Sequence, residues 1–214
     1  MKVIDVLGVN LDPEGFHGTR WNTSLIDSLG IPWVLPVVRA IEAVMAADST
    51  LNHEYLPILG LPAFRDAAVR LSLGSASSAL VDNRAAGVQT ISGTGALRLA
   101  ADFLYNNMAS HSTTVLCSNP TWPNHYSIFK AAGFKNLTSY TYWNVKERSI
   151  DLDGLLTDLN DAPNNSIVIL HGCCHNPTGC DPTKEQWKQI ASVVITKSHF
   201  CVFDSAFQVY HKRN

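Results

Sequence analysis

From Gly87 onward the sequence alternates short apolar runs with amphipathic segments, and this alternation limits the chain to few folds. Apolar runs at Thr113–Cys117, Ser166–Leu170 and Phe200–Phe203 predict buried strands, and the segments between them have helical periodicity. Strands that are joined through helices form parallel sheets. We therefore predict an α/β fold with a mainly parallel sheet and helices on both faces.

The other predicted elements follow the same rules of periodicity and capping. Gly74 and Gly133 are expected to end helices, and Thr183 with Gln186 forms a capping-box pattern at a helix start. Further helices are predicted at 32–48, 62–74, 96–104, 123–132, 150–159 and 183–195, and further strands at 3–9, 87–91 and 137–142.

Composition excludes several classes of protein. Hydrophobic residues make up 46% of the 214 residues and charged residues 16%, which is typical of a globular chain with a sizeable core. The net charge of −2, without a basic block, argues against a nucleic-acid partner. No apolar run approaches the ~20 residues of a membrane span. The N-terminus has no signal or transit pattern, and the five cysteines have no disulfide spacing, so we expect a cytoplasmic location.

Polar groups follow the predicted strands in four places, Ser92–Gly95, Ser118–His125, His171–Gly179 and Asp204–Gln208. Because the carboxyl ends of parallel strands meet at one edge of a sheet, these loops are expected to converge. The stretch His171–Gly179 reads His-Gly-Cys-Cys-His-Asn-Pro-Thr-Gly, in which Pro177 restricts the backbone of Asn176 and Gly179 can take a positive φ.

Each of these groups has a functional and an ordinary interpretation. Ser92–Gly95 precedes a helix, where free N–H groups attract an anion such as a phosphate monoester, although a tight turn with a cap has the same pattern. Trp122 could stack on a flat ring or lie partly buried in the core. Asp204 could hold a protonated pyridine nitrogen, cap a helix or form a structural ion pair.

Other kinds of site have weaker support. His171, Cys173, Cys174 and His175 suggest a metal site, but neighbouring residues of extended chain point to opposite faces and the second half of a zinc pattern is missing. We therefore predict no metal site. No Gly-x-Ser-x-Gly hydrolase motif is present. A Rossmann-like nucleotide binder would need an acidic residue after the second strand, where Ser118 and Asn119 stand instead.

The motifs together resemble a known family, the pyridoxal-phosphate-dependent fold type I aminotransferases of class I/II, and within it the cytoplasmic type of aspartate aminotransferase. The matching stretches run in family order from Gly30: Pro32–Val38, Leu51–Leu61, Ser92–Arg98, Pro120–Trp122 with Asn124-His125, His175–Gly179 and Asp204–Ala206. The resemblance implies transfer of an amino group between L-aspartate and 2-oxoglutarate. It also implies a divergent segment at 1–31, a helical segment at 32–86 and a cofactor-binding domain at 87–214.

The resemblance implies a role for several residues around pyridoxal 5'-phosphate. Trp122 would stack on the pyridine ring and touch substrate. Asn176 would bond the ring hydroxyl oxygen and help to bind the substrate carboxylate, and Asp204 would hold the ring nitrogen protonated. His125 and His171 would support Asp204 from behind.

The phosphate and the subunit contact complete the implied site. Ser92, Gly93 and Thr94 would hold the cofactor phosphate, and Tyr55 would reach the phosphate of the partner subunit's cofactor in a homodimer.

The sequence departs from the family pattern in ways that bear on catalysis. Phe207 stands where the family has a tyrosine, and neither the cofactor-binding lysine in its Ser-x-Ser-Lys segment nor the later substrate arginines are found. Lys184, Lys188 and Lys197 lie in no matching motif. We expect a chain truncated at its C-terminus, with no catalytic lysine and no activity alone. The alternative is a non-catalytic isoform or pseudoenzyme that binds the cofactor or a partner subunit. A sheet that ends at Phe203 is also expected to expose an edge.

Overall fold

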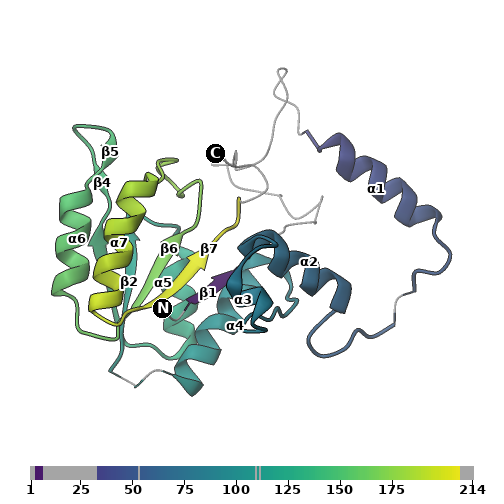
Figure 1. The fold of residues 1–214 in the computed structure, drawn as a ribbon, viewed down its shortest axis with the longest axis horizontal. Helices are drawn as coiled ribbons and strands as arrows, with labels where there is room; N and C mark the ends of the chain where they lie inside the picture. Colours follow the sequence, from purple (N-terminus) through teal and green to yellow (C-terminus); the bar gives the residue numbers. More distant parts are fainter. Residues whose placement is uncertain (1–2, 7–32, 53, 109, 111, 208–214) are drawn as a thin grey trace. The chain divides into compact units, whose positions relative to one another are not determined.

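A computed structural model describes residues 3–6, 33–52, 54–108, 110 and 112–207. The chain divides into two compact units, one of residues 11–58 and one of residues 1–10 with 59–214. The second unit contains the sheet, which Figure 1 shows with helices against it. Apart from residues 3–6, the divergent segment predicted at 1–31 lies outside the described residues.

The five-stranded sheet is parallel throughout and has the order β1-β7-β6-β2-β3. Its central strands β2 and β6 are largely apolar and buried, as the short apolar runs predicted. Within the described residues, the fold class and the positions of these strands are confirmed. The strands are β1 (Val3–Val6), β2 (Thr114–Asn119), β3 (Asn136–Thr141), β6 (Ile167–His171) and β7 (Phe200–Asp204).

Helices cover both faces of the sheet, as predicted. One core contains α4 (Ser92–Asn107) and α5 (Asn124–Ala132), and the other contains α6 (Leu152–Asp161) and α7 (Lys184–Thr196). Figure 1 shows α6 and α7 side by side along the sheet. The first core includes Leu97, Leu104, Phe129 and Val202, and the second includes Leu116, Leu155, Leu159 and Ile190. Full burial of each such side chain contributes roughly 1.5–3 kcal/mol.

The direction in which the chain adds strands to the sheet reverses between β2 and β6. From β2 the chain passes through α5 to β3 on one side, whereas from β6 it passes through α7 to β7 on the other side. Because successive crossovers have the same hand, the reversal of direction puts α5 and α7 on opposite faces. The loops after β2 and β6 therefore diverge between neighbouring strands, which is where open α/β sheets bind ligands.

Local capping explains where these helices begin and end. Thr183 and Gln186 form the predicted capping box of α7, with Gln186 N–H donating to Thr183 Oγ1 over 3.2 Å. Asp151 caps α6 by accepting from Gly154 N–H over 3.0 Å. Gly133 ends α5 with a φ of 113°, a conformation that glycine adopts without strain.

Two expectations about strands are wrong. Residues 87–91 form no strand, because the segment has one backbone bond to its neighbour, from Gln89 N–H to Leu59 O at 3.0 Å, rather than a ladder. The strand that ends after Phe203 is not the edge expected there, since β1 pairs with β7 from Val3↔Cys201 to Val6↔Asp204 and is itself the edge strand on this side. A short antiparallel pair, β4 (Trp143–Asn144) with β5 (Ser149–Ile150), lies apart from the main sheet.

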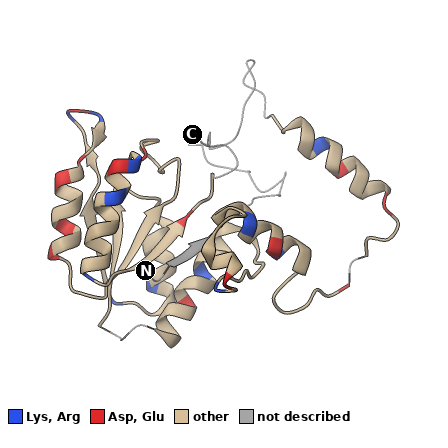
Figure 2. Cartoon of the chain, viewed as in Figure 1, with Lys and Arg blue, Asp and Glu red and all other residues tan. Residues whose placement is uncertain are grey.

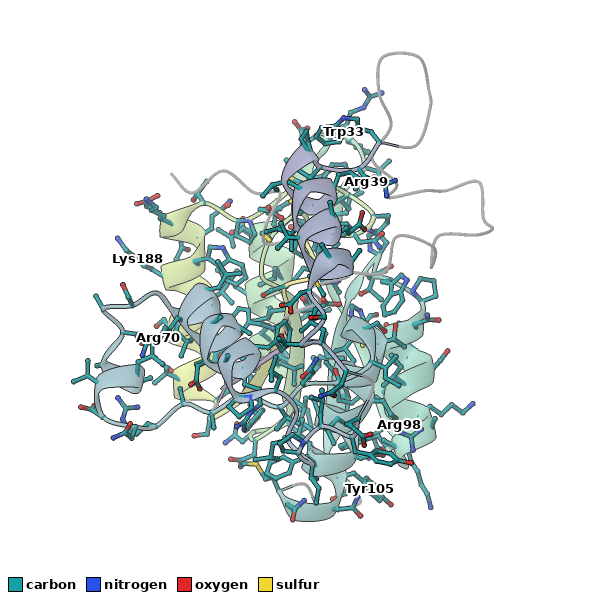
Figure 3. All side chains as sticks on the ribbon, turned by 90° about the vertical axis from the view of Figure 1, so that its right-hand side faces the viewer. Trp33, Arg39, Arg70, Arg98, Tyr105 and Lys188 are labelled. Atoms are coloured by element: carbon teal, nitrogen blue, oxygen red, sulfur yellow. The ribbon has the colours of Figure 1, made fainter. Side chains whose placement is uncertain are left out.

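The helices before α4 are α1 (Pro36–Ala47), α2 (Pro62–Leu73) and α3 (Ser78–Val81), and none has a fully buried residue. Gly74 ends α2 with a φ of 78°, as predicted. Figure 3 labels Trp33 and Arg39 at the beginning of α1. Figure 2 shows both signs of charge on α1, α2 and α7. Among the described residues, no helix is both long enough and apolar enough to span a bilayer.

Candidate functional site

The carboxyl ends of β2, β6 and β7 bring together polar side chains from distant parts of the sequence. Ser118 lies within β2, and His171 and Asp204 are the last residues of β6 and β7. His171 and Asp204 stand side by side in the strand register. His125 belongs to the first turn of α5 rather than to the preceding loop.

Asp204 is the acceptor around which this cluster is built. Its side chain is 13% exposed, and Oδ2 lies 2.9 Å from Nε2 of the fully buried His125. Oδ1 accepts from Ala206 N–H over 3.2 Å. Gly172 N–H donates to the backbone oxygen of Asp204 over 2.8 Å and ties the loop after β6 to the end of β7. The carboxylate therefore has a fixed position and keeps acceptor capacity on its exposed side.

A series of hydrogen bonds runs from the loop after β6 to Asp204. Asn176 N–H donates to His171 Nδ1 over 3.0 Å, so the ring proton of His171 lies on Nε2. This Nε2–H faces Thr121 Oγ1 at 3.3 Å, and the Thr121 hydroxyl in turn faces His125 Nδ1 at 2.8 Å. The proton on His125 Nε2 then points to Asp204 Oδ2. One direction of donation satisfies every contact, and it leaves Asp204 as an acceptor.

Burial keeps two of these imidazoles uncharged. It lowers the pKa of His171 to about 4, and the neighbouring His125 contributes in the same direction. It lowers the pKa of His175 to about 3, with a further contribution from His171. At neutral pH the negative charge of Asp204 is therefore not compensated by a cationic His171 or His175, and an added cationic N–H group would bond to it strongly.

Trp122 lies at the same edge of the sheet. It is half-buried and packs against the core on the α4/α5 face, as the ordinary interpretation proposed. Its ring meets His125 edge to face, with 5.5 Å between the centroids and 86° between the planes. The indole is thus held next to the imidazole that bonds to Asp204.

The loop after β6 is held by one carboxylate. Asp181 accepts from Cys174 N–H over 2.7 Å and from His175 N–H over 2.8 Å, which positions the following Asn176. Gly179 has a φ of 66°, so its predicted positive φ is confirmed. Burial raises the pKa of the Cys173 thiol to about 12, and no metal-binding group of three or more ligands occurs among the described residues.

Ser92, Gly93 and Thr94 form the first turn of α4, which no side chain caps. Helix α4 has 16 residues and β2 has six, so they span about 24 Å and about 20 Å. Since α4 precedes β2 in the chain, its first turn is expected at the level of the carboxyl edge. Its N–H groups could bind an anion there. Within the described part of the chain, no hydrogen bond joins it to Asp204.

Two residues that the sequence analysis named, Tyr55 and Phe207, are not members of the hydrogen-bonded cluster around Asp204. Tyr55 is fully exposed and belongs to the other compact unit, so the structure does not place it relative to Asp204. Phe207 is half-buried and lies in the turn after β7.

Sequence reasoning gave no role to Thr121, Ser118, Asp181 or Tyr142, although each holds a member of the cluster. Thr121 and Ser118 stand in a predicted polar loop, which was the available signal.

Comparisons with curated proteins identify relatives whose sequences match most of this chain. Cytoplasmic aspartate aminotransferase of Gallus gallus is 54% identical over 182 residues, which cover 84% of this chain and 44% of the relative. The cytoplasmic enzyme of Caenorhabditis elegans is 51% identical over 84% of this chain and 43% of its own length. The chain thus spans less than half the length of these curated relatives.

Solved structures agree in fold. Aspartate aminotransferase from Saccharomyces cerevisiae cytoplasm has a TM-score of 0.80 at 44% identity, over 85% of this chain and 43% of that one. Aromatic-amino-acid aminotransferase from Burkholderia pseudomallei, covalently bound to pyridoxal phosphate, has a TM-score of 0.79 at 34% identity, over 85% and 45%. The sequence model of the family described as aminotransferase class I and II matches residues 28–212. The chain therefore belongs to the aminotransferase class I and II family.

Proposed function

We propose that residues 1–214 form the pyridoxal-phosphate-binding part of an aspartate aminotransferase, whose reaction converts L-aspartate and 2-oxoglutarate to oxaloacetate and L-glutamate. The observation that carries the proposal is the directed series of hydrogen bonds from Asn176 to Asp204. It ends on a fixed, partly exposed carboxylate, which is the group that a protonated pyridine nitrogen requires. The names of the relatives support a cytoplasmic location.

The donor set of this chain fits the cofactor. Asp204 would bond the ring nitrogen, Trp122 would stack on the ring, and Asn176 would donate to the ring hydroxyl oxygen and help to bind the substrate carboxylate. Ser92, Gly93 and Thr94 would bind the phosphate at the first turn of α4. Pyridoxal phosphate, when bound, supplies an electron sink for the carbanion at the amino acid's α-carbon.

The rest of the proposal concerns catalysis and assembly. Lys184 and Lys188 are exposed on α7, and Lys197 caps its C-terminus, so none of the three belongs to the Asp204 cluster. We expect residues 1–214 alone to bind the cofactor without a covalent bond and to have negligible transaminase activity, since loss of a general base alone costs about 10²–10⁴ in rate. Tyr55, exposed in the other compact unit, would act in a homodimer on the partner subunit's cofactor.

The test is titration of the purified chain with pyridoxal phosphate, followed by visible absorbance and then borohydride reduction. We expect saturable binding, little covalent trapping, and weaker binding by Asp204→Ala than by the control Lys188→Ala. Absence of saturable binding by the wild-type chain would contradict cofactor binding. Stoichiometric trapping, with turnover of aspartate near that of a full-length relative, would contradict the expected inactivity.

A second candidate is a non-catalytic chain that pairs with an intact subunit. The exposed apolar residues of α1 favour it, because Val37, Ile41 and Val44 are 63%, 53% and 64% exposed. Sedimentation of the chain alone and with a full-length relative distinguishes this candidate from a chain that only binds the cofactor.

A further inference from the structure

Three aromatic rings form a continuous stack behind the hydrogen-bonded series. The rings of Tyr142 and His175 lie 3.8 Å apart, centroid to centroid, with 11° between their planes. His175 in turn stacks on His171 at 4.2 Å and 28°. The ring of His171 also meets that of His125 edge to face, at 5.1 Å and 80°. His171 therefore contacts one nearly parallel ring and one nearly perpendicular ring.

His175 is held in place through all its polar atoms. Nε2 lies 2.9 Å from Ser118 Oγ, and Nδ1 lies 2.9 Å from Thr178 Oγ1. Its N–H donates to Asp181, and its backbone oxygen accepts from Gly179 N–H. The residue is 1% exposed. These bonds fix the direction of the ring nitrogens, and the stacked ring of Tyr142 supports one face of the ring.

Tyr142 closes the stack from the far side. It is 4% exposed, it follows the last residue of β3, and its hydroxyl donates to Cys180 O over 2.6 Å. The ring is thus attached both to β3 and to the loop after β6.

The orientation of the His171 ring decides whether the hydrogen bonds from Asn176 to Asp204 can form. Rotation of this ring by half a turn about χ2 would exchange Nδ1 with a carbon and break the bonds to Asn176 and Thr121 at once. During such a rotation the ring must pass through a position perpendicular to its stacked neighbour. A ring at 4.2 Å leaves no room for that movement.

We propose that Tyr142 and His175 are positioning residues, whose stacked rings hold His171 with Nδ1 toward Asn176 N–H and Nε2–H toward Thr121. The stack would then act on Asp204 through three intervening side chains, and its effect on the cofactor rests on the proposed function above. Neither residue touches Asp204 directly in the contacts of the described residues.

The first test is ¹⁵N NMR of histidine-labelled protein at neutral pH, which reports the tautomer of His171 without any cofactor. In the wild type we expect the Nε2–H form. Tyr142→Leu should give averaged ring signals, whereas Tyr142→Phe, which keeps the ring and loses the hydroxyl, should preserve the wild-type pattern. Trp187→Leu is the matched control, because Trp187 packs against the same core and pairs with Phe203 instead.

Three NMR results would overturn the inference. In the wild type, His171 would carry its proton on Nδ1 or would be charged. In the variants, the His171 tautomer would be unchanged in Tyr142→Leu or changed in Tyr142→Phe. Circular dichroism checks the fold of each variant. If Tyr142→Leu does not fold, Tyr142→Met replaces it, since methionine fills a similar space without a ring.

The second test uses pyridoxal phosphate. Tyr142→Leu should weaken its binding about three- to tenfold, and Tyr142→Phe and Trp187→Leu should bind as the wild type does. If the wild type binds no pyridoxal phosphate but the NMR result holds, the proposed function fails and the positioning role stands. If the wild type binds and Tyr142→Leu binds equally well with an unchanged tautomer, only the positioning role fails.

Discussion

Helices α1 and α6 have comparable amphipathic patterns but different surroundings. Helix α6 buries Leu155 and Leu159 completely against the sheet. Helix α1 has no buried residue, and Val37 and Val44 along its apolar side are 63% and 64% exposed. The comparison shows that helical periodicity specifies an apolar face but not the surface that covers it. The predictions below test whether stability is concentrated in the sheet unit and association in α1.

The largest expected effect comes from emptying the core. Leu159→Ala should lower the free energy of unfolding by about 2–5 kcal/mol, because it leaves a cavity under α6. The matched change Ile41→Ala in α1 should cost about 0.5 kcal/mol or less, since Ile41 is already 53% exposed. Urea denaturation followed by tryptophan fluorescence measures both. Equal losses would show that α1 is buried in solution.

Acid should weaken the sheet unit next most strongly. Unfolded histidine takes up a proton near pH 6.5, but folded His171 does so only near pH 4. The contribution of His171 to stability is therefore complete above pH 6.5. It is lost as the pH falls from 6.5 to 4, at about 1.4 kcal/mol for each unit of difference between the two pKa values. Denaturation midpoints across this range should fall, and less steeply in His171→Asn. Helix α1 contains no histidine and should keep its helicity. A midpoint independent of pH would contradict a buried neutral His171.

Loss of the capping box should have a smaller effect. Thr183→Ala removes the acceptor for Gln186 N–H at the start of α7 and should cost about 1 kcal/mol, whereas Thr183→Ser should keep most of the stability. Leu35→Ala at the uncapped start of α1 serves as the comparison and should change little. Thermal denaturation ranks the three proteins, and a Thr183→Ala midpoint equal to the wild type would argue against the cap.

The smallest effect on stability is expected for polar changes on α1. Val44→Ser should alter the free energy of unfolding by about 0.5 kcal/mol or less. It should, however, weaken self-association, which analytical ultracentrifugation detects, because it interrupts an exposed apolar face. Ala43→Ser on the same helix is the control. If Val44→Ser associates as the wild type does, α1 is not the contact surface.

Periodicity and capping predicted most of the sheet unit. The strands at β2, β3, β6 and β7 and the helices between them were predicted to within a few residues, because each contains enough local pattern to reveal its period. The strand expected at 87–91 was wrong, since a strand needs a partner that a local pattern does not name. The pairing of β1 with β7 was missed for the same reason.

The candidate site divides in the same way. Positions after predicted strands and the family resemblance indicated Asp204, His125, His171, Trp122 and Asn176, and their roles toward a cofactor stay predictions. The contacts that link them pass through Thr121, Ser118 and Tyr142, to which sequence reasoning assigned no role. Other contacts of the cluster join residues that are far apart in the sequence, by 50 positions for Thr121 with His171 and by 79 for His125 with Asp204.

Residue chemistry that acts within a few positions, such as capping, turns and alternating polarity, was sufficient to specify the α/β class and the edge of the sheet where polar groups gather. The proton direction through His171, the stack behind it and the strand that covers β7 depended on the folded chain. These features arise from contacts between segments brought together by sheet order and burial, and the free energy of such contacts depends on distance and solvent exposure, neither of which a linear pattern contains.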